Sequence, residues 1–373
     1  MSNRILLLSS RADHGGGPRH IEYIINETYQ NFEFHVACPE ETPYWSRFQK
    51  LVGNRMVRLP HRQLSLGSLR SVLRYVSYNS IDLIHSHGKG AGLYAKIIKS
   101  FTRKRWLHTP HGIHVDQYRF LTKKLYSFYE NFLLSNPDKI IFVSEEERKK
   151  ANLEKIWVGV PFDVVPNGVS IISMENRKAL RSKGRELIGL SDKDKVVVTL
   201  SRFDYQKNMR EAFLIAQRLP NMKFIWVGDG PEKVKLNEEI KNIKIKNIKI
   251  IDFCDNSLPY LGAGDIYLST SKWEGLPLSI LEAMSLGLPI VASNVIGHKD
   301  LVEKSQSGIL YTLGNQSEAV KAIKRLLEDK TLYNFTQTSA INNQTLYFSS
   351  KLMGEKISKI YSKILDRDQN EDA

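Results

Sequence analysis

The sequence is poor in cysteine, with only Cys38 and Cys254 in 373 residues. The two residues lie far apart and lack the close spacing of zinc-binding or redox motifs, which argues against a disulfide framework or a thiolate metal site. Few thiols in a long chain are typical of a reducing compartment. We therefore expect a cytoplasmic protein.

Long apolar runs are also missing. No window of about 18 apolar residues occurs, so no transmembrane helix is predicted, and residues 1–8 lack the cleavage region of a signal peptide. Apolar residues make up 42% of the chain and charged residues 25%, as in an ordinary globular protein. A length of 373 residues suggests two domains.

Two common enzyme motifs are absent as well. The glycine-rich loop at residues 14–18 lacks the Gly-x-Gly-x-x-Gly spacing of dinucleotide-binding folds, although Glu40 could mimic the ribose-binding acid. A nicotinamide enzyme therefore stays only as a weak alternative. A triad hydrolase is weaker still, because the chain contains no Gly-x-Ser-x-Gly elbow.

Positive charge, by contrast, is concentrated in one stretch. Residues 47–124 contain 16 Lys or Arg and only two acids, Asp82 and Asp116, and the whole chain carries a net charge of +14. Such a surface favours an anionic partner. Four aromatic residues interleaved with the basic ones favour an anionic membrane surface over nucleic acid, for which no recognition motif is present; they are Trp45, Phe48, Phe101 and Trp106.

Short apolar segments alternate with amphipathic ones along the chain, and the alternation restarts after a turn-rich stretch at 164–168. This pattern predicts an α/β protein with two doubly wound domains facing a cleft. We expect an N-terminal domain at 1–170, a C-terminal domain at 171–348, and a helix within 349–373 that crosses back to the N-terminal domain and ends in a frayed tail. The predicted strands lie at 4–10, 34–38, 81–86, 106–109, 139–144, 195–201, 223–228, 248–251, 265–270 and 288–293.

The stretch 271–287 carries the main chemical signal. It follows a predicted strand, and Pro277 and Gly287 mark the expected start and end of a helix of about ten residues. The unpaired amides of such a helix start suit a phosphate or diphosphate. Glu274 and Glu282 bracket that anion site, and two carboxylates there suit sugar hydroxyls better than the anion itself. The alternative is a plain strand-helix unit with two solvated acids.

Two further groups fall at the carboxyl ends of predicted strands, where doubly wound sheets bind ligands. Arg202 and Lys207 could clamp a diphosphate.

Five of the ten histidines lie within 85–114, which raises the question of a zinc site. Because Pro110 and Gly112 interrupt that run, no regular helix presents His108, His111 and His114 together, and we expect one histidine to face the cleft without a metal.

The sequence resembles the retaining glycosyltransferases of family 4, which have a two-Rossmann B-type fold. The resemblance extends over roughly residues 1–350. It rests on a Glu-x7-Glu motif at Glu274–Glu282, a clamp at Ser201-Arg202…Lys207, Val227-Gly-Asp-Gly-Pro-Glu232, Val165-Pro-Asn-Gly-Val-Ser170, Gly16-Gly-Pro-Arg-His20, Asp82-Leu-Ile-His-Ser-His87 and Thr109-Pro-His111-Gly.

The resemblance implies specific roles. Arg202 and Lys207 would hold the donor diphosphate, Glu282 the ribose, and Glu274 the transferred sugar. His111 would contact a sugar hydroxyl or stabilise charge at the anomeric carbon. The remaining residues implied to bind the donor are Gly16, Gly17, Gly228, Phe253, Cys254, Gly275, Leu276, Leu278 and Ser279. No cofactor or metal is implied, because the two cations do the work of a divalent ion.

The function implied is transfer of a hexose, with retention, from a nucleotide-diphosphate donor such as a UDP-sugar to a saccharide acceptor linked to a lipid diphosphate. The product would belong to O-antigen, capsule or exopolysaccharide synthesis. The enzyme would sit at the inner face of the cytoplasmic membrane through its basic segment. A nucleotide-sugar epimerase or another enzyme on the same fold, and a non-catalytic binding protein for anionic ligands, remain the alternatives.

Overall fold

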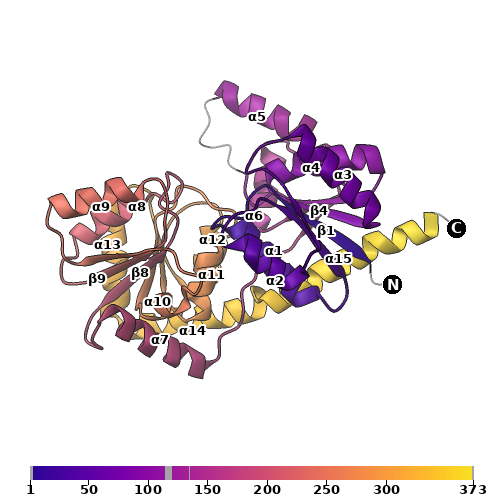
Figure 1. The fold of residues 1–373 in the computed structure, drawn as a ribbon. Helices are drawn as coiled ribbons and strands as arrows, with labels where there is room; N and C mark the ends of the chain where they lie inside the picture. The colour runs from indigo at the N-terminus through magenta and orange to yellow at the C-terminus, as the bar shows by residue number, and fades with distance from the viewer. Residues whose placement is uncertain (1–2, 114–119, 134, 372–373) are drawn as a thin grey trace. The chain divides into compact units, whose positions relative to one another are not determined.

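The computed structural model describes residues 3–113, 120–133 and 135–371. Backbone contacts divide the chain into two compact units, drawn in Figure 1. The first consists of residues 1–168 and 350–373, and the second of residues 169–349.

The first unit is built on a seven-stranded parallel sheet in the order β3-β2-β1-β4-β5-β6-β7. The strands are β1 (Arg4–Ser9), β2 (Glu33–Cys38), β3 (Met56–Arg58), β4 (Leu83–His87), β5 (Arg105–Thr109), β6 (Lys139–Phe142) and β7 (Phe162–Val164). The helices are α1 (Gly16–Thr28), α2 (Tyr44–Val52), α3 (Leu66–Tyr78), α4 (Lys89–Thr102), α5 (Phe120–Leu133), α6 (Glu145–Leu153) and α15 (Ser350–Glu371).

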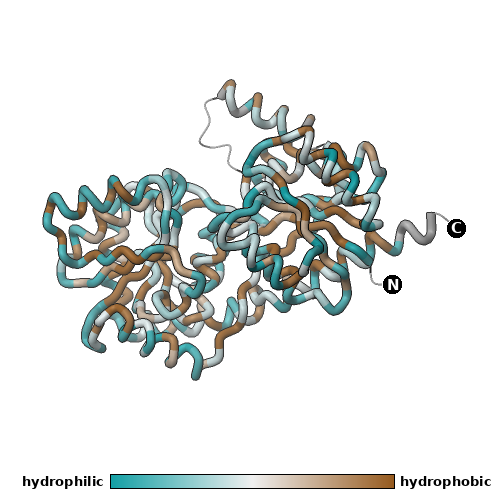
Figure 2. The backbone as a smooth tube through the Cα atoms, in the orientation of Figure 1, coloured by the Kyte–Doolittle hydropathy of each residue, from teal (hydrophilic) through white to brown (hydrophobic). Residues whose placement is uncertain are grey.

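The central strand β1 explains why this sheet has helices on both faces. Its run of four apolar residues is fully buried, with Ile5 and Leu7 in one core cluster and Leu6 and Leu8 in another. Successive side chains of a strand point to opposite faces, so an unbroken apolar run needs cover on both sides. Figure 2 shows hydrophobic residues concentrated along the strands.

Helix α15 completes one of these two cores although it follows the second unit in sequence. Its buried side chains include Ile357 and Tyr361, which belong to the same cluster as Ile5. Gly354 allows a close approach to α1, since a Cβ at this position would lie 2.4 Å from the Cβ of Glu27. The last helix is therefore an integral part of the first unit.

The second unit contains a six-stranded parallel sheet in the order β10-β9-β8-β11-β12-β13. The strands are β8 (Val196–Leu200), β9 (Lys223–Val227), β10 (Ile248–Ile251), β11 (Ile266–Ser269), β12 (Ile290–Ser293) and β13 (Gly308–Tyr311). The helices are α7 (Met174–Ile188), α8 (Met209–Gln217), α9 (Lys233–Asn242), α10 (Leu258–Gly262), α11 (Leu278–Ser285), α12 (His298–Val302), α13 (Gln316–Glu328) and α14 (Lys330–Tyr347).

The predicted fold class of two doubly wound α/β units is confirmed, and several element boundaries need correction. The helix expected from Arg19 already begins at Gly16, inside the predicted loop. Pro277 precedes α11 as its cap residue, in an extended conformation, and does not form its first turn. Helix α15 extends to Glu371, and the frayed tail expected from residue 366 stays a prediction. Three strands of three or four residues each were missed because such short segments carry little periodic signal; they are β3, β7 and β13.

The expected aromatic and basic surface is wrong in part. Phe48 and Trp106 are fully buried and belong to the two cores, whereas Phe101 is 73% exposed. Several basic residues of the 47–124 segment form ion pairs with acids outside it, which reduces the free positive charge; the pairs are Arg47–Glu22, Arg58–Glu40, Lys89–Glu130, Lys99–Asp138 and Arg105–Asp138. Among the described helices, none is long and apolar enough to cross a bilayer.

Candidate functional site

The predicted donor-binding residues of the second unit gather at one place in its sheet. Chain connectivity reverses direction between the neighbouring strands β8 and β11, and parallel sheets bind ligands at the carboxyl ends of strands at such a switch point. Arg202 and Lys207 lie in the loop after β8, and Glu274 lies in the loop after β11. Helix α11 then begins at Leu278 and carries Glu282.

Lys207 and Glu274 form an ion pair across these two loops, with 2.5 Å between Lys207 Nζ and Glu274 Oε1. Gln206 joins them by donating from Nε2 to the Trp273 carbonyl at 3.0 Å and to Glu274 Oε2 at 3.5 Å. Burial raises the pKa of Glu274, but the adjacent Lys207 cation outweighs burial and leaves the pKa below its usual range. The site therefore holds an ionised carboxylate and a cation in direct contact.

Arg202 is held by its own loop. Its Nη2 lies 2.9 Å from Asp204 Oδ2 and donates to Gln206 Oε1 at 3.3 Å. Asp204 Oδ1 also accepts from the backbone N–H of Lys207 at 3.1 Å. Sequence reasoning missed the positioning roles of Asp204 and Gln206, although both stand inside the motif that contains the two cations.

The start of α11 lies beside the same loops. Tyr267 of β11 donates its hydroxyl to the Leu200 carbonyl at 3.0 Å and contacts Ser279. Burial raises the pKa of Tyr267, and the charges of Glu274 and Glu282 raise it further. Both predicted sugar-binding carboxylates thus act on one buried hydroxyl, and both are buried themselves.

Two glycines permit close backbone approach in this region. Gly228 has φ +149°, and a Cβ there would lie 1.9 Å from the Ser201 carbonyl oxygen, so the loop after β9 rests directly on the loop after β8. Gly297 has φ +86°, and a Cβ there would lie 2.3 Å from the carbonyl oxygen of Gly275. Residues with side chains would displace the loops that carry Arg202 and Glu274.

His298 is a further buried residue of this site that sequence reasoning missed. Its Nδ1 lies 2.7 Å from the Ser293 carbonyl, and its Nε2 lies 3.3 Å from Ser269 Oγ. Burial lowers its pKa, although the Glu274 carboxylate opposes that shift. The sequence contained one signal, since Gly297-His298 follows a strand end.

The other predicted donor-binding residues are placed by local structure. Leu276 and Leu278 are buried on either side of Pro277, and Ser279 is half-buried in the first turn of α11. Phe253 and Cys254 are half-buried in the loop after β10, at the same edge of the parallel sheet as Arg202.

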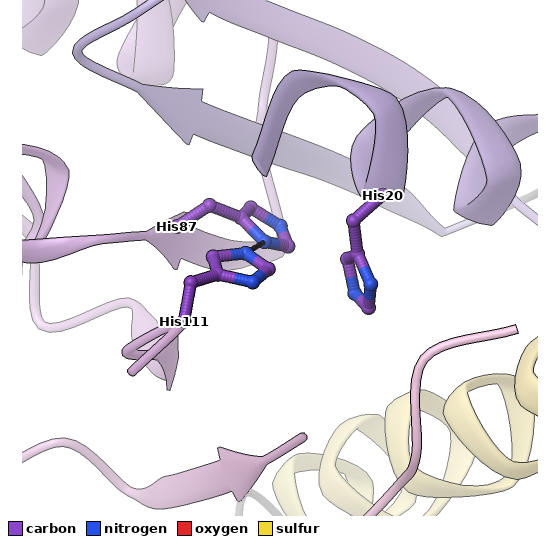
Figure 3. A group of neighbouring side chains, drawn as sticks. All are labelled: His20, His87 and His111. Atoms are coloured by element: carbon purple, nitrogen blue, oxygen red, sulfur yellow. Dashed lines mark hydrogen bonds between the residues drawn. The ribbon is translucent and has the colours of Figure 1, made fainter. Parts of the chain in front are cut away.

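In the first unit, three histidines from separate elements converge, as Figure 3 shows. His20 lies in α1, His87 ends β4, and His111 follows β5. One nitrogen of each ring lies within 4.8 Å of the others, and His87 Nδ1 is 3.1 Å from His111 Nε2. Burial lowers the pKa of each imidazole, to about 4 for His20, so all three are neutral near pH 7.

The glycine loop lies next to this cluster. A Cβ at Gly17 would lie 3.8 Å from His111 Cδ2, whereas a Cβ at Gly16 would meet no atom within 4 Å. The backbone at His111 is left-handed, with φ 61°. The carboxylate of Glu147 holds the next residue, because Oε1 accepts from Gly112 N–H and Oε2 accepts from Val143 N–H at 2.8 Å. Burial raises the pKa of Glu147 to about 7.

These three histidines are the group that could hold a metal ion among the described residues. They differ from the zinc group considered from the sequence: His108 instead contacts Ser86 Oγ through Nδ1 at 2.9 Å, and His114 lies outside the described residues. Histidine ligands are normally oriented by a second hydrogen bond. Within the described part of the chain, His87 Nδ1 has such a bond, to His111 Nε2, whereas His87 Nε2 has no partner and is open to a ligand.

The structure thus brings together Arg202, Lys207, Glu274 and Glu282 in the second unit. It brings His20, His87 and His111 together in the first unit. The expectation that His111 acts on the same donor as Glu274 stays a prediction.

Comparisons with known proteins place both units in one class. The family model described as Glycosyltransferase Family 4 matches residues 14–171, and the model described as Glycosyl transferases group 1 matches residues 181–343. An Escherichia coli UDP-Gal:alpha-D-GlcNAc-diphosphoundecaprenol alpha-1,3-galactosyltransferase is 27% identical over 350 residues, covering 89% of each chain. An alpha-monoglucosyldiacylglycerol synthase of Streptococcus pneumoniae is 24% identical over 80% of this chain and 70% of its own. The solved structure of Anabaena Alr3699/HepE in complex with UDP-glucose superposes with a TM-score of 0.83 at 19% identity, covering 96% of this chain and 99% of that one.

Proposed function

The chain belongs to the glycosyltransferases of the B-type fold, and from that premise we propose that it transfers a hexose, with retention, from a UDP-sugar to a saccharide linked to a lipid diphosphate. The observation that carries this proposal is the Lys207–Glu274 ion pair beside Arg202 at the switch point of the second sheet. The cation can bind the diphosphate of a nucleotide sugar, and the carboxylate in contact with it can bind hydroxyls of the sugar ring.

The roles of the residues follow from their placement. Arg202, Lys207 and the first amides of α11 bind the diphosphate, because an N-terminal helix turn and two cations both attract anions. Glu274 contacts hydroxyls of the transferred sugar, and Glu282, one turn into the helix, binds the ribose. The neutral histidine cluster that contains His111 offers hydrogen bonds to hydroxyl groups.

In the proposed reaction, the bond between the anomeric carbon and the diphosphate oxygen breaks while the acceptor oxygen bonds to the same face of that carbon. The acceptor proton passes to the departing diphosphate oxygen. Negative charge grows on the diphosphate, and Arg202 and Lys207 stabilise it more strongly in the transition state than in the ground state. The protein then needs no divalent ion for this step.

The acceptor class is proposed from the E. coli relative, whose name specifies a diphosphoundecaprenol-linked GlcNAc as its acceptor. An enzyme that uses such an acceptor works at a membrane surface, so we place this protein at the cytoplasmic face of the membrane, in synthesis of a surface polysaccharide.

A screen of nucleotide sugars tests the proposal. The purified protein is incubated with each donor, with and without a short lipid-diphosphate glycoside, and the released nucleotide and the new glycosidic bond are followed by chromatography and NMR. We expect one UDP-sugar to be used, an acceptor-dependent product, and a bond with the donor's anomeric configuration. Isomerisation of a donor without acceptor would indicate an epimerase instead.

A further inference from the structure

Helix α5 exposes a continuous apolar stripe. Leu121, Leu125, Phe128 and Phe132 are 79%, 66%, 63% and 60% exposed. Their spacing of four, three and four residues puts them on one face of the helix. The rings of Phe128 and Phe132 lie parallel on that face, with centroids 5.5 Å apart.

The opposite face of α5 is attached to α4. Glu130 is 1% exposed and lies 3.3 Å from Lys89 Nζ, and the same ammonium lies 3.8 Å from the centroid of the Tyr126 ring. Lys96 donates from Nζ to the Phe132 carbonyl. The apolar residues are therefore exposed because the helix turns its other side to the body of the unit.

The charges that α4 and α5 contribute are almost all positive. Helices α4 and α5 together contain five lysines, and their one acid is Glu130, which is buried and paired with Lys89. Lys124 is exposed on α5 next to the stripe, and Arg103 and Phe101 are exposed at the end of α4. The surface thus combines large apolar side chains with positive charge and exposes no carboxylate from either helix.

This combination matches the interface of an anionic bilayer. A helix that lies in a membrane surface presents Leu and Phe to the acyl chains and Lys or Arg to the headgroup phosphates, and each basic residue near an anionic leaflet adds attraction. A protein partner of standard size would need a broader patch, of about 800 Å² on each side, whereas the stripe is one helix face wide. Two helices that expose lysines and no carboxylate also disfavour pairing with the same helices of a second copy.

We propose that α5 inserts Leu121, Leu125, Phe128 and Phe132 into the surface of an anionic membrane and anchors the first unit there. The proposed anchor is smaller than the membrane-binding surface expected from the sequence, because it is one short helix with apolar and basic residues and not the whole of 47–124. Only the purpose of the anchor rests on the proposed function: the anchor keeps the enzyme next to a lipid-linked acceptor.

Vesicle cosedimentation of the full chain tests the proposal. The vesicles consist of phosphatidylcholine alone or of phosphatidylcholine with phosphatidylglycerol. The test variant is Leu125→Ser/Phe128→Ser. Its matched control is Leu66→Ser/Leu153→Ser, which removes two leucines of the same unit that are 75% and 79% exposed on other helices. All four positions are exposed, so both variants should fold, and circular dichroism checks this.

We expect wild type and control to bind the anionic vesicles, and the test variant to bind them about tenfold more weakly or worse, because two large apolar side chains leave the bilayer. Lys124→Glu should also weaken binding to anionic vesicles. Tryptophan at the stripe, in Phe128→Trp, should add fluorescence that brominated lipids quench.

Three results would overturn the proposal: equal binding of the test variant and wild type, no binding of wild type to anionic vesicles, or a wild-type dimer that the test variant dissolves. The last result would assign the stripe to a second copy. Donor hydrolysis without vesicles separates this question from the proposed function, because the test variant should hydrolyse donor at the wild-type rate. A protein that binds vesicles but uses no nucleotide sugar would refute the proposed function and leave the anchor standing.

Discussion

Lys207 Nζ lies 2.5 Å from Glu274 Oε1, so the cation predicted to hold the donor diphosphate already contacts the carboxylate predicted to hold the sugar. The two residues are 67 positions apart and come from loops after neighbouring strands. The Lys207 cation keeps the buried Glu274 carboxylate ionised, because an unpaired buried charge is costly. The ion pair also fixes the direction of the Lys207 side chain before any donor binds.

Lys207→Ala should lower turnover by about 10²–10³, the scale of losing one charge-stabilising donor in a transition state. Steady-state rates with saturating donor and acceptor measure the effect. Lys321→Ala, which removes an exposed lysine of α13 in the same unit, serves as the control and should leave turnover unchanged. Turnover equal to that of wild type in Lys207→Ala would contradict the clamp.

Glu282→Ala should mainly weaken donor binding, since the buried carboxylate is proposed to bond the ribose hydroxyls. Calorimetric titration with UDP measures the loss, and Glu282→Gln, which keeps the volume of the side chain, separates lost hydrogen bonds from lost packing. Unaltered affinity for UDP in both variants would reject the ribose role.

Glu147 should make stability depend on pH in a direction that can be checked. Burial raises the pKa of Glu147 to about 7 in the folded protein from its ordinary value of 4.5, so the folded state favours the protonated form. The stabilisation of the folded state that follows from this raised pKa is complete below pH 4.5 and is lost as the pH rises through 7. Relative to Glu147→Gln, wild type should lose up to about 3 kcal/mol of unfolding free energy between pH 4.5 and 8. Urea titrations of both proteins measure this difference, and a constant difference would contradict it.

The buried histidines should make the protein sensitive to acid. Burial lowers the pKa of His20 to about 4 and of His108 to about 3, and it lowers the pKa values of His85, His87 and His111 well below 6.5. Unfolding therefore takes up protons below pH 6.5, and the stability present above that pH is lost as the pH falls. Each histidine contributes up to about 1.4 kcal/mol per pH unit. Urea midpoints between pH 7 and 5 should fall steeply, and His108→Gln should flatten that slope if it folds.

Metal removal should leave the reaction intact. Dialysis against EDTA should not change turnover, because Arg202 and Lys207 neutralise the diphosphate. The three-histidine cluster provides the counter-test: loss of activity in EDTA that zinc restores in wild type but not in His20→Asn would show that His20, His87 and His111 form a required metal centre.

Much of this architecture follows from local sequence. Runs such as Val196–Leu200 must be buried on both faces, and the eight-residue interval between Glu274 and Glu282 places both acids around one helix start. Contacts between residues of different strands and loops cannot be predicted from local sequence in this way. The pairing of Lys207 with Glu274, the place of His298, and the meeting of His20 with His87 and His111 depend on strand order, which no local pattern encodes. Phe48 and Trp106 were misplaced because neighbouring basic residues suggested a surface, whereas their own faces point into the core.

The return of α15 to the first unit has a consequence for how the protein is made. Residues 1–168 leave the ribosome well before residues 350–371 are synthesised. Tyr361 therefore becomes available only after the whole second unit has been made. Until then the cluster around Ile5 lacks one of its walls, and His85 lacks the hydroxyl that lies 2.7 Å from its Nδ1. Until α15 is synthesised, a hydrophobic face of the first unit is therefore left uncovered. A chain truncated near residue 349 would lack the helix that covers this face.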